Sequence, residues 1–194
     1  MHTGAVNHRH KNSQKRIYIR DAVYFITCAT YHRIPYFKEK IFCDVFVENL
    51  RRSQQLKGFK LYGYFLGYDH FHMLIKPNNK WNYSEIMQSL KRNTSRDINK
   101  LINLSAGEVP QPRRYREVLH QIIGENMDSR LQEWAMLLKD NHIPFKWQKS
   151  FHDHYIRNER DFCNQLNYIR GNPLKHNMLN NWPYVWIDVE IEPP

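Results

Sequence analysis

The chain has 194 residues, and its 29 Lys and Arg against 19 Asp and Glu give a formal net charge of +10. Apolar residues make up 41% and aromatic residues 14% of the sequence, which is enough for a hydrophobic core and excludes a chain that is disordered throughout. No apolar run approaches the roughly 20 residues of a membrane helix, and the N-terminus lacks the apolar core of a signal peptide. We therefore expect a cytoplasmic, single-domain protein whose charge favours a polyanionic partner.

Hydrophobic periodicity predicts the secondary-structure elements. Residues 1–16 are expected to form a flexible basic arm. Strands are predicted over residues 23–31, 59–66, 70–76 and 145–155, and helices over 39–57, 84–102 and 159–170. Gly58 is expected to cap the first helix and Ser84 to begin the second, while Pro173 limits the third. This order predicts an α+β domain over residues 17–180, with an antiparallel sheet flanked by helices, a helical insertion at about 103–143 and a tail over 181–194.

Three pairs of histidines are separated by one residue, at positions 8 and 10, 70 and 72, and 152 and 154. Only His70 and His72 lie in a convincing strand, where alternation places both imidazoles on one face and the intervening Phe71 on the other. Two neutral imidazoles side by side on a strand make half of a divalent-metal site. The alternative is a pair of buried histidines that hydrogen-bond to their neighbours.

The last predicted helix carries Asn164, Tyr168 and Asn172 at a spacing of four residues, so all three lie on one stripe. The apolar residues of the helix point elsewhere, which leaves Tyr168 facing a site. A phenol beside a metal-bound phosphate acts as a nucleophile and forms a covalent intermediate. The alternative is that Tyr168 is one of the 12 tyrosines that only pack.

Basic residues follow one face of the helix predicted over 84–102 and continue in the arm. Contacts of such residues with phosphates supply affinity for nucleic acid without regard to its sequence. A solvated helix face is the alternative. The residues expected to contact DNA are Lys91, Arg92, Arg96, Lys100, Arg16 and Arg20.

Residues 64–77 (Tyr-Phe-Leu-Gly-Tyr-Asp-His-Phe-His-Met-Leu-Ile-Lys-Pro) resemble the histidine-hydrophobic-histidine strand of the single-tyrosine, IS200-like transposases. They are most similar to the branch of REP-associated tyrosine transposases. Residues 147–159 and 168–173 resemble the second signature of that branch, and Ser89-Leu90-Lys91 also fits. The resemblance covers roughly residues 17–102 and 145–180. The chain departs from the family at Gly67-Tyr68-Asp69, where Met-Pro-Asn is usual, and in the longer stretch 103–143.

The resemblance implies a ferredoxin-like domain that cleaves and rejoins single-stranded DNA at REP-type hairpins through a 5′-phosphotyrosine. Tyr168 would be the nucleophile, and His70, His72 and Asn172 would bind Mg²⁺ or Mn²⁺. A location in the bacterial cytoplasm, with the nucleoid, is implied, and self-association is left open. The alternative is a hairpin-binding protein without catalysis, either a domesticated relative or an RNA-binding module. A rolling-circle replication initiator, which shares the histidine site, ranks third. Three further residues that match the family signature would lie beside the metal ligands, contact DNA or have a structural role: His152, Asp153 and His154.

Overall fold

The computed structural model describes residues 16–78, 80–105, 136, 143–178 and 181–188. Most of the expected arm and of the expected insertion lies outside these residues. A five-stranded sheet has the order β4-β1-β3-β2-β5, and every pairing is antiparallel. The main elements are β1 (Tyr24–Ala29), α1 (Lys40–Lys57), β2 (Lys60–Leu66), β3 (His70–Lys76), α2 (Tyr83–Ser105), β4 (His152–Tyr155), α5 (Glu159–Lys175) and β5 (Val185–Ile187).

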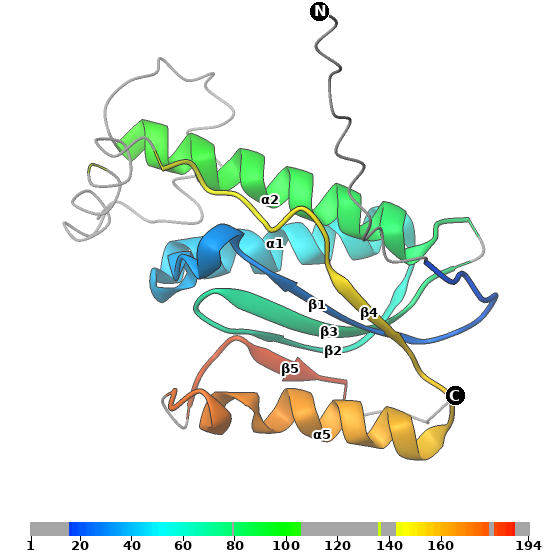
Figure 1. The fold of residues 1–194 in the computed structure, drawn as a ribbon. Helices are drawn as coiled ribbons and strands as arrows, with labels where there is room; N and C mark the ends of the chain where they lie inside the picture. The colour runs from blue at the N-terminus through cyan, green and yellow to red at the C-terminus, as the bar shows by residue number, and fades with distance from the viewer. Residues whose placement is uncertain (1–15, 79, 106–135, 137–142, 179–180, 189–194) are drawn as a thin grey trace, which may run out of the picture.

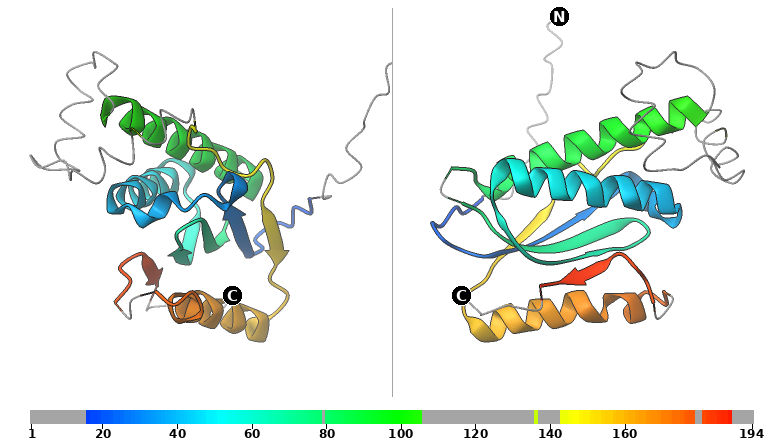
Figure 2. Two further views of the ribbon diagram at one scale, coloured as in Figure 1. Left: turned by 60° about the vertical axis from the view of Figure 1, so that its left-hand side comes forward. Right: turned by 180° about the vertical axis from the view of Figure 1, so that it is seen from behind.

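The elements from β1 to β4 follow one another as strand, helix, strand, strand, helix, strand, with the spatial order β4-β1-β3-β2. This is the ferredoxin-like arrangement, so the predicted α+β fold with an antiparallel sheet is confirmed. Helices α1 and α2 cover one face of the sheet, and α5 covers the other (Figures 1 and 2). No helix in the described part of the chain combines the length and the apolarity that crossing a bilayer requires.

The central strand β3 contributes side chains to both faces of the sheet. Phe71, Met73 and Ile75 are buried in the core beneath α1 and α2. Leu74 belongs to the second core, on the α5 side, and the pleat of the strand places His70 and His72 on that same side. The predicted alternation is therefore confirmed, and both imidazoles face α5.

Two helix boundaries, the start of α2 and the end of α5, differ from their predictions. Asn82, not Ser84, caps α2: its side-chain oxygen accepts from the Glu85 N–H at 3.0 Å, and the Glu85 carboxylate accepts from the Asn82 N–H at 2.9 Å. Helix α5 continues through Pro173 to Lys175. The missing N–H of Pro173 removes only the bond to the Ile169 carbonyl, and the backbone N–H of His176, beyond the proline, still donates to the Asn172 carbonyl at 3.0 Å.

The strand predicted over residues 145–155 is shorter in the structure, and the tail contains a strand that was not predicted. Within that range, residues 152–155 form β4, while Trp147 makes only an isolated bridge to Thr30. Residues 185–187 pair with β2 as β5. The pattern Val-Trp-Ile was a strand signal, but three residues are too few for a periodicity argument.

Arg16 connects the start of the described chain to β4 and α2. Its guanidinium forms an ion pair with Asp153 and donates to the Phe151 carbonyl at 3.1 Å. It also lies 3.6 Å from the centroid of the Phe151 ring. The second carboxylate oxygen of Asp153 accepts from the Tyr83 hydroxyl at 2.9 Å. Because the Arg16 and Asp153 side chains are only 18% and 11% exposed, we assign Arg16 a structural role. Its predicted contact with DNA stays a prediction.

We expect Arg16→Met to lower the free energy of unfolding by about 1 to 3 kcal/mol, because it leaves the largely buried Asp153 carboxylate without its cation. Urea denaturation followed by circular dichroism measures this change. Arg20→Met is the matched control, since the Arg20–Asp21 pair is exposed and its atoms are 3.7 Å apart; we expect a change within about 0.5 kcal/mol. Equal effects of the two substitutions would contradict the structural role of Arg16.

Candidate active site

The two imidazoles of β3 form a pair that is almost completely shielded from solvent. His70 and His72 are each 5% exposed, and their ring centroids lie 5.0 Å apart with the planes 76° from parallel. The Nδ1 atom of His70 lies 2.6 Å from Asp69 Oδ1, and the Nδ1 atom of His72 lies 2.7 Å from Thr27 Oγ1. These bonds use the same nitrogen of each ring and leave Nε2 available to a ligand, as in metal-binding histidines.

Gly67 makes room for the His70 ring in the turn before β3. A Cβ atom at this position would lie 3.0 Å from Cε1 of His70 and 3.0 Å from a ring carbon of Phe65. The backbone N–H of Gly67 donates to the His70 carbonyl at 2.8 Å and closes the turn. Any larger residue would therefore displace one of the two rings.

Helix α5 brings Tyr168 and His176 against the histidine pair. The Tyr168 ring lies 5.1 Å from the His72 ring and 5.8 Å from the Phe25 ring, measured between centroids. Tyr168 is 37% exposed, so its hydroxyl is open to an incoming molecule, and the Lys175 ammonium donates to that hydroxyl at 3.3 Å. His176, which caps the C-terminus of α5, lies with its ring centroid 4.8 Å from that of His70.

Asn172 lies midway between these two contacts on α5. It follows Tyr168 by one helical turn and precedes His176 by another, so it faces the same side of the helix. Since Tyr168 contacts His72 and His176 contacts His70, Asn172 faces the histidine pair. Its side chain is fully buried; Nδ2 donates to the Tyr168 carbonyl, while Oδ1 has no hydrogen-bond partner. An unsatisfied buried oxygen is costly, and a cation bound beside the histidine pair would satisfy this one.

These donor atoms fit a divalent cation. Two imidazole nitrogens and one amide oxygen form a mixed set, which suits Mn²⁺ better than it suits Mg²⁺ because Mg²⁺ prefers oxygen ligands. Among the described residues, no group of three or more His, Cys, Asp or Glu is placed to hold a metal ion. Among the described residues of α5, Asn172 offers a buried amide oxygen without a hydrogen-bond partner as a candidate third ligand.

Burial keeps His72 in the neutral form that a metal requires. Desolvation, followed by the neighbouring charges of His70 and His176, lowers the pKa of His72 to about 3. Burial acts to raise the pKa of Asp69, but the hydrogen bond from His70 and the charges of His70 and Arg33 outweigh it and hold this pKa below its usual value. The site thus contains a neutral imidazole and an ionised carboxylate at neutral pH.

His176 did not emerge from the sequence as a member of the site, whereas Asp69 did, as a departure from the family pattern that would either alter the metal environment or hold the turn. His176 continues the stripe of Asn164, Tyr168 and Asn172 by four more residues, and this spacing could have indicated it. The expected end of the helix at Pro173 concealed that signal. The departure at Asp69 was visible in the sequence, but the contact with His70 depends on the conformation of the turn.

The residues from 152 to 154 lie on β4, next to β1. His154 donates through Nε2 to the Asp161 carboxylate of α5 at 2.8 Å, and Asp153 binds Arg16 and Tyr83. His152 is exposed and pairs in register with Thr27, which in turn pairs with His72. Asp153 and His154 therefore hold β4 in place, and His152 is separated from the histidine pair by one strand.

A basic groove of about 490 Å³ lies between α2 and the segment that leads to β4. Lys91, Arg92, Lys146 and Lys149 line it, and none of the described residues around it is a carboxylate. The Lys91 ammonium also donates to the Gln148 carbonyl at 2.7 Å. The sequence indicated the α2 residues but not Lys146 and Lys149, because only the folded chain brings residues 146–149 beside α2.

The cations predicted to contact DNA lie at several places on the molecule. Arg92 is exposed on α2, and Arg96 on the same helix binds Asp97 at 2.8 Å. Lys100 is half-buried near the end of α2. Arg20 is exposed and forms the ion pair with Asp21. The structure therefore brings only Lys91 and Arg92 of the predicted set into the basic groove.

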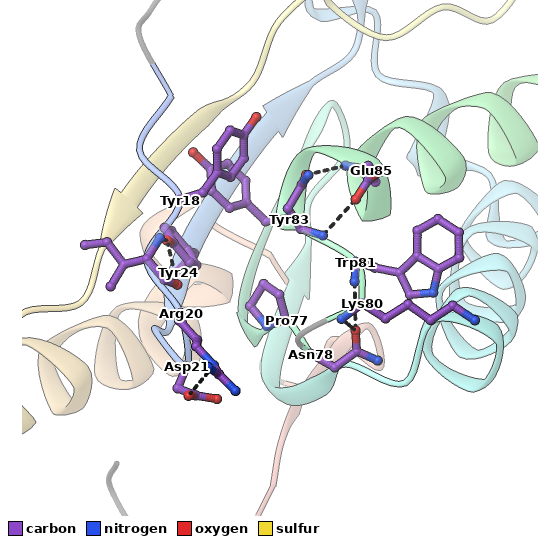
Figure 3. A pocket seen from close by; sticks show the side chains of 12 residues that line it. Tyr18, Arg20, Asp21, Tyr24, Pro77, Asn78, Lys80, Trp81, Tyr83 and Glu85 are labelled. Atoms are coloured by element: carbon purple, nitrogen blue, oxygen red, sulfur yellow. Dashed lines mark hydrogen bonds and ion pairs between the residues drawn. The ribbon is translucent and has the colours of Figure 1, made fainter.

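A larger hollow of about 550 Å³ lies at the opposite end of β3 from the histidine pair, beside Pro77 and the start of α2 (Figure 3). Tyr18 and Trp81 contribute aromatic surface to it. Its cations Arg20 and Lys80 are balanced by Asp21 and Glu85 among the residues that line it. None of the predicted catalytic residues lines this hollow, so size alone does not identify the active site.

Comparison with known proteins places this geometry in context. Residues 18–109 match the family model described as "Transposase IS200 like". Over 41 residues the chain is 44% identical to a Haemophilus influenzae protein that carries the name REP-associated tyrosine transposase; the match spans 20% of this chain and only 23% of that protein. A solved structure of a REP-associated tyrosine transposase bound to a REP hairpin superposes with a TM-score of 0.60 at 17% identity, covering 90% of this chain and 81% of that one. The superposition shows a shared fold.

We expect the metal-free protein to lose about 2 kcal/mol of stability through His72 between pH 8 and pH 5. The unfolded chain takes up a proton at this residue below pH 6.5, whereas the folded chain does so only near pH 3, so the unfolded state binds more protons as the pH falls. Urea denaturation in EDTA at the two pH values measures the difference. In His72→Gln the loss should be smaller, and an identical pH dependence in both proteins would show that His72 titrates normally.

Proposed function

We propose that the chain is an IS200-like, metal-dependent tyrosine transposase that cleaves and rejoins single-stranded DNA at REP-type hairpins; the family-model match over residues 18–109 and the shared fold support this. The observation that carries this proposal is the placement of an accessible tyrosine, Tyr168, against the buried pair of His70 and His72. The hairpin is suggested by the structural neighbour, which is bound to a REP hairpin. Action in the bacterial cytoplasm, at the nucleoid, stays a prediction.

The proposed ligands are Nε2 of His70, Nε2 of His72 and Oδ1 of Asn172. Each of the two imidazoles has its other nitrogen engaged by the protein, and the amide oxygen is buried without a partner. Mg²⁺ or Mn²⁺ bound there would polarise the scissile phosphate and orient it. The residues themselves supply a rigid, largely dry setting that keeps the phosphate beside Tyr168.

Tyr168 is the proposed nucleophile. Its hydroxyl oxygen forms a bond to phosphorus while the bond from phosphorus to the 3′ oxygen breaks, which leaves a 5′-phosphotyrosine and a free 3′-OH. The phenolic proton passes to solvent, and the departing 3′ oxygen takes up a proton. The Lys175 ammonium, 3.3 Å from the phenolic oxygen, orients the hydroxyl and favours the negative charge that develops on it. Attack by another 3′-OH reverses these bonds and joins new ends without ATP.

The basic groove is the proposed site for the phosphate backbone of the hairpin. Its four cations belong to two segments that the fold brings together, and their charge is not offset by carboxylates among the described lining residues. Arg92, with Lys146 and Lys149, is exposed and open to phosphates. Arg20, Arg96 and Lys100 remain proposed contacts outside the groove.

We expect wild-type protein, incubated with Mn²⁺ and end-labelled single-stranded hairpin DNA from repeats that flank its gene, to form a covalent protein–DNA adduct on a denaturing gel. Tyr168→Phe should form none, because phenylalanine has no nucleophilic oxygen. Tyr155→Phe is the matched control, since Tyr155 is 38% exposed against 37% for Tyr168 and should support wild-type adduct formation.

An adduct that persists in Tyr168→Phe would exclude Tyr168 as the nucleophile. Tight hairpin binding without an adduct in any variant would favour the hairpin-binding protein without catalysis.

We expect Lys146→Gln combined with Lys149→Gln to weaken hairpin binding and to reduce the slope of log K against log salt by about 1.5 to 2, because two phosphate contacts are lost. Fluorescence anisotropy at several salt concentrations measures the slope. The double variant Lys60→Gln with Lys80→Gln removes the same charge at two exposed lysines outside the groove and should retain the wild-type slope. An equal decrease in both double variants would mean that net charge, and not the groove, determines binding.

A further inference from the structure

We infer that Asp69 is a positioning residue that fixes the ring of His70 in one tautomer, with Nε2 free for a metal ion. The inference deepens the proposed function and rests on it, because it concerns how one of the proposed ligands is prepared. Asp69 occupies a position at which the resembled family usually has asparagine. A carboxylate at this position is therefore a feature of this chain.

The hydrogen bond between Asp69 and His70 determines where the proton of the imidazole lies. Asp69 Oδ1 and His70 Nδ1 are 2.6 Å apart, and an ionised carboxylate can only accept a hydrogen bond. His70 Nδ1 must therefore carry a hydrogen, and whenever the ring is neutral its lone pair lies on Nε2. The partner of His72 does not impose this choice, because the Thr27 hydroxyl at 2.7 Å can donate or accept.

Asp69 is itself held at three other points. Its backbone carbonyl accepts from the backbone N–H of Thr30 at 2.8 Å and from the Thr30 hydroxyl at 3.1 Å. Its Oδ2 atom lies 3.4 Å from the Arg33 guanidinium. The carboxylate is thus placed by the segment that follows β1, and His70 cannot rotate without losing a bond to a fixed partner.

The backbone of that segment supports a positional role. His32 and Arg33 have φ angles of 54° and 56°, in the left-handed region that non-glycine residues seldom adopt. Such conformations cost free energy and persist where the surrounding contacts require them. Here the left-handed turn places Arg33 beside Asp69, so that each oxygen of the carboxylate has a partner within the protein.

The charge of Asp69 has a second consequence. An asparagine could accept the same hydrogen bond through Oδ1, but it would carry no net charge. A carboxylate bound to Nδ1–H raises the basicity of the opposite nitrogen and with it the affinity for a cation. Asp69 should therefore support tighter metal binding than the asparagine that is usual in the family.

The test compares wild type with Asp69→Ala, which removes the hydrogen bond, and Asp69→Asn, which retains an acceptor but removes the charge. The ¹⁵N NMR shifts of the histidine rings in the metal-free protein report the tautomer of His70, and calorimetry with Mn²⁺ reports affinity. We expect wild type and Asp69→Asn to hold the proton on Nδ1 and Asp69→Ala to lose this preference. Mn²⁺ affinity should fall about 10- to 100-fold in Asp69→Ala and by a smaller factor in Asp69→Asn.

Thr27→Val is the matched control, because it removes the partner of His72 Nδ1 and should leave the tautomer of His70 unchanged. If Asp69→Ala keeps both the wild-type tautomer and the wild-type affinity, the positioning role is overturned. If Asp69→Asn retains the tautomer but abolishes Mn²⁺ binding as completely as Asp69→Ala, Asp69 is a ligand and the inference is also overturned. If wild type binds no Mn²⁺, the proposed function fails, whereas the tautomers in the same samples still decide the role of Asp69.

Discussion

The packing of α5 on the sheet is the contact on which the candidate active site depends. Phe162 and Ile169 of this helix are fully buried in the core that also contains Leu74 of β3. Burial of these side chains sets the rotation of the helix, and the opposite choice of face would expose them at a cost of about 1.5 to 3 kcal/mol each. Once the helix is held in this way, Tyr168 has to lie against His72.

The sheet divides two kinds of chemistry between its faces. The histidine pair, Tyr168 and Asn172 lie on the α5 side, where burial favours the neutral form of His72. The basic groove lies on the α2 side, where Lys146 and Lys149 remain exposed and keep their charge in water. Separating the two is physically favourable, because further cations beside the histidines would repel a bound metal ion, while the groove needs several cations close together.

Much of the site could be predicted from short-range pattern. The alternation of β3 predicted that both imidazoles share a face, and helical spacing predicted that Asn172 shares the stripe of Tyr168; neither conclusion requires knowledge of distant residues. The same reasoning failed at Pro173, where the helix continues to Lys175 although proline lacks the N–H that would donate to the Ile169 carbonyl. It also treated Arg16 as a free cation, because nothing local to the sequence indicates that Asp153 is its partner.

The order of the elements and the face that each one buries follow from the sequence alone, because they depend on periodicities of two and 3.6 residues. The chemistry of each face follows from side-chain type. The tertiary structure shows which side chains lie close together. These are Tyr168 and His72, Asp69 and His70 in a tight turn, and Lys146 and Lys91 in the basic groove. These contacts depend on the packing of residues that are far apart in the chain and on the conformations of short turns. No local pattern specifies either one.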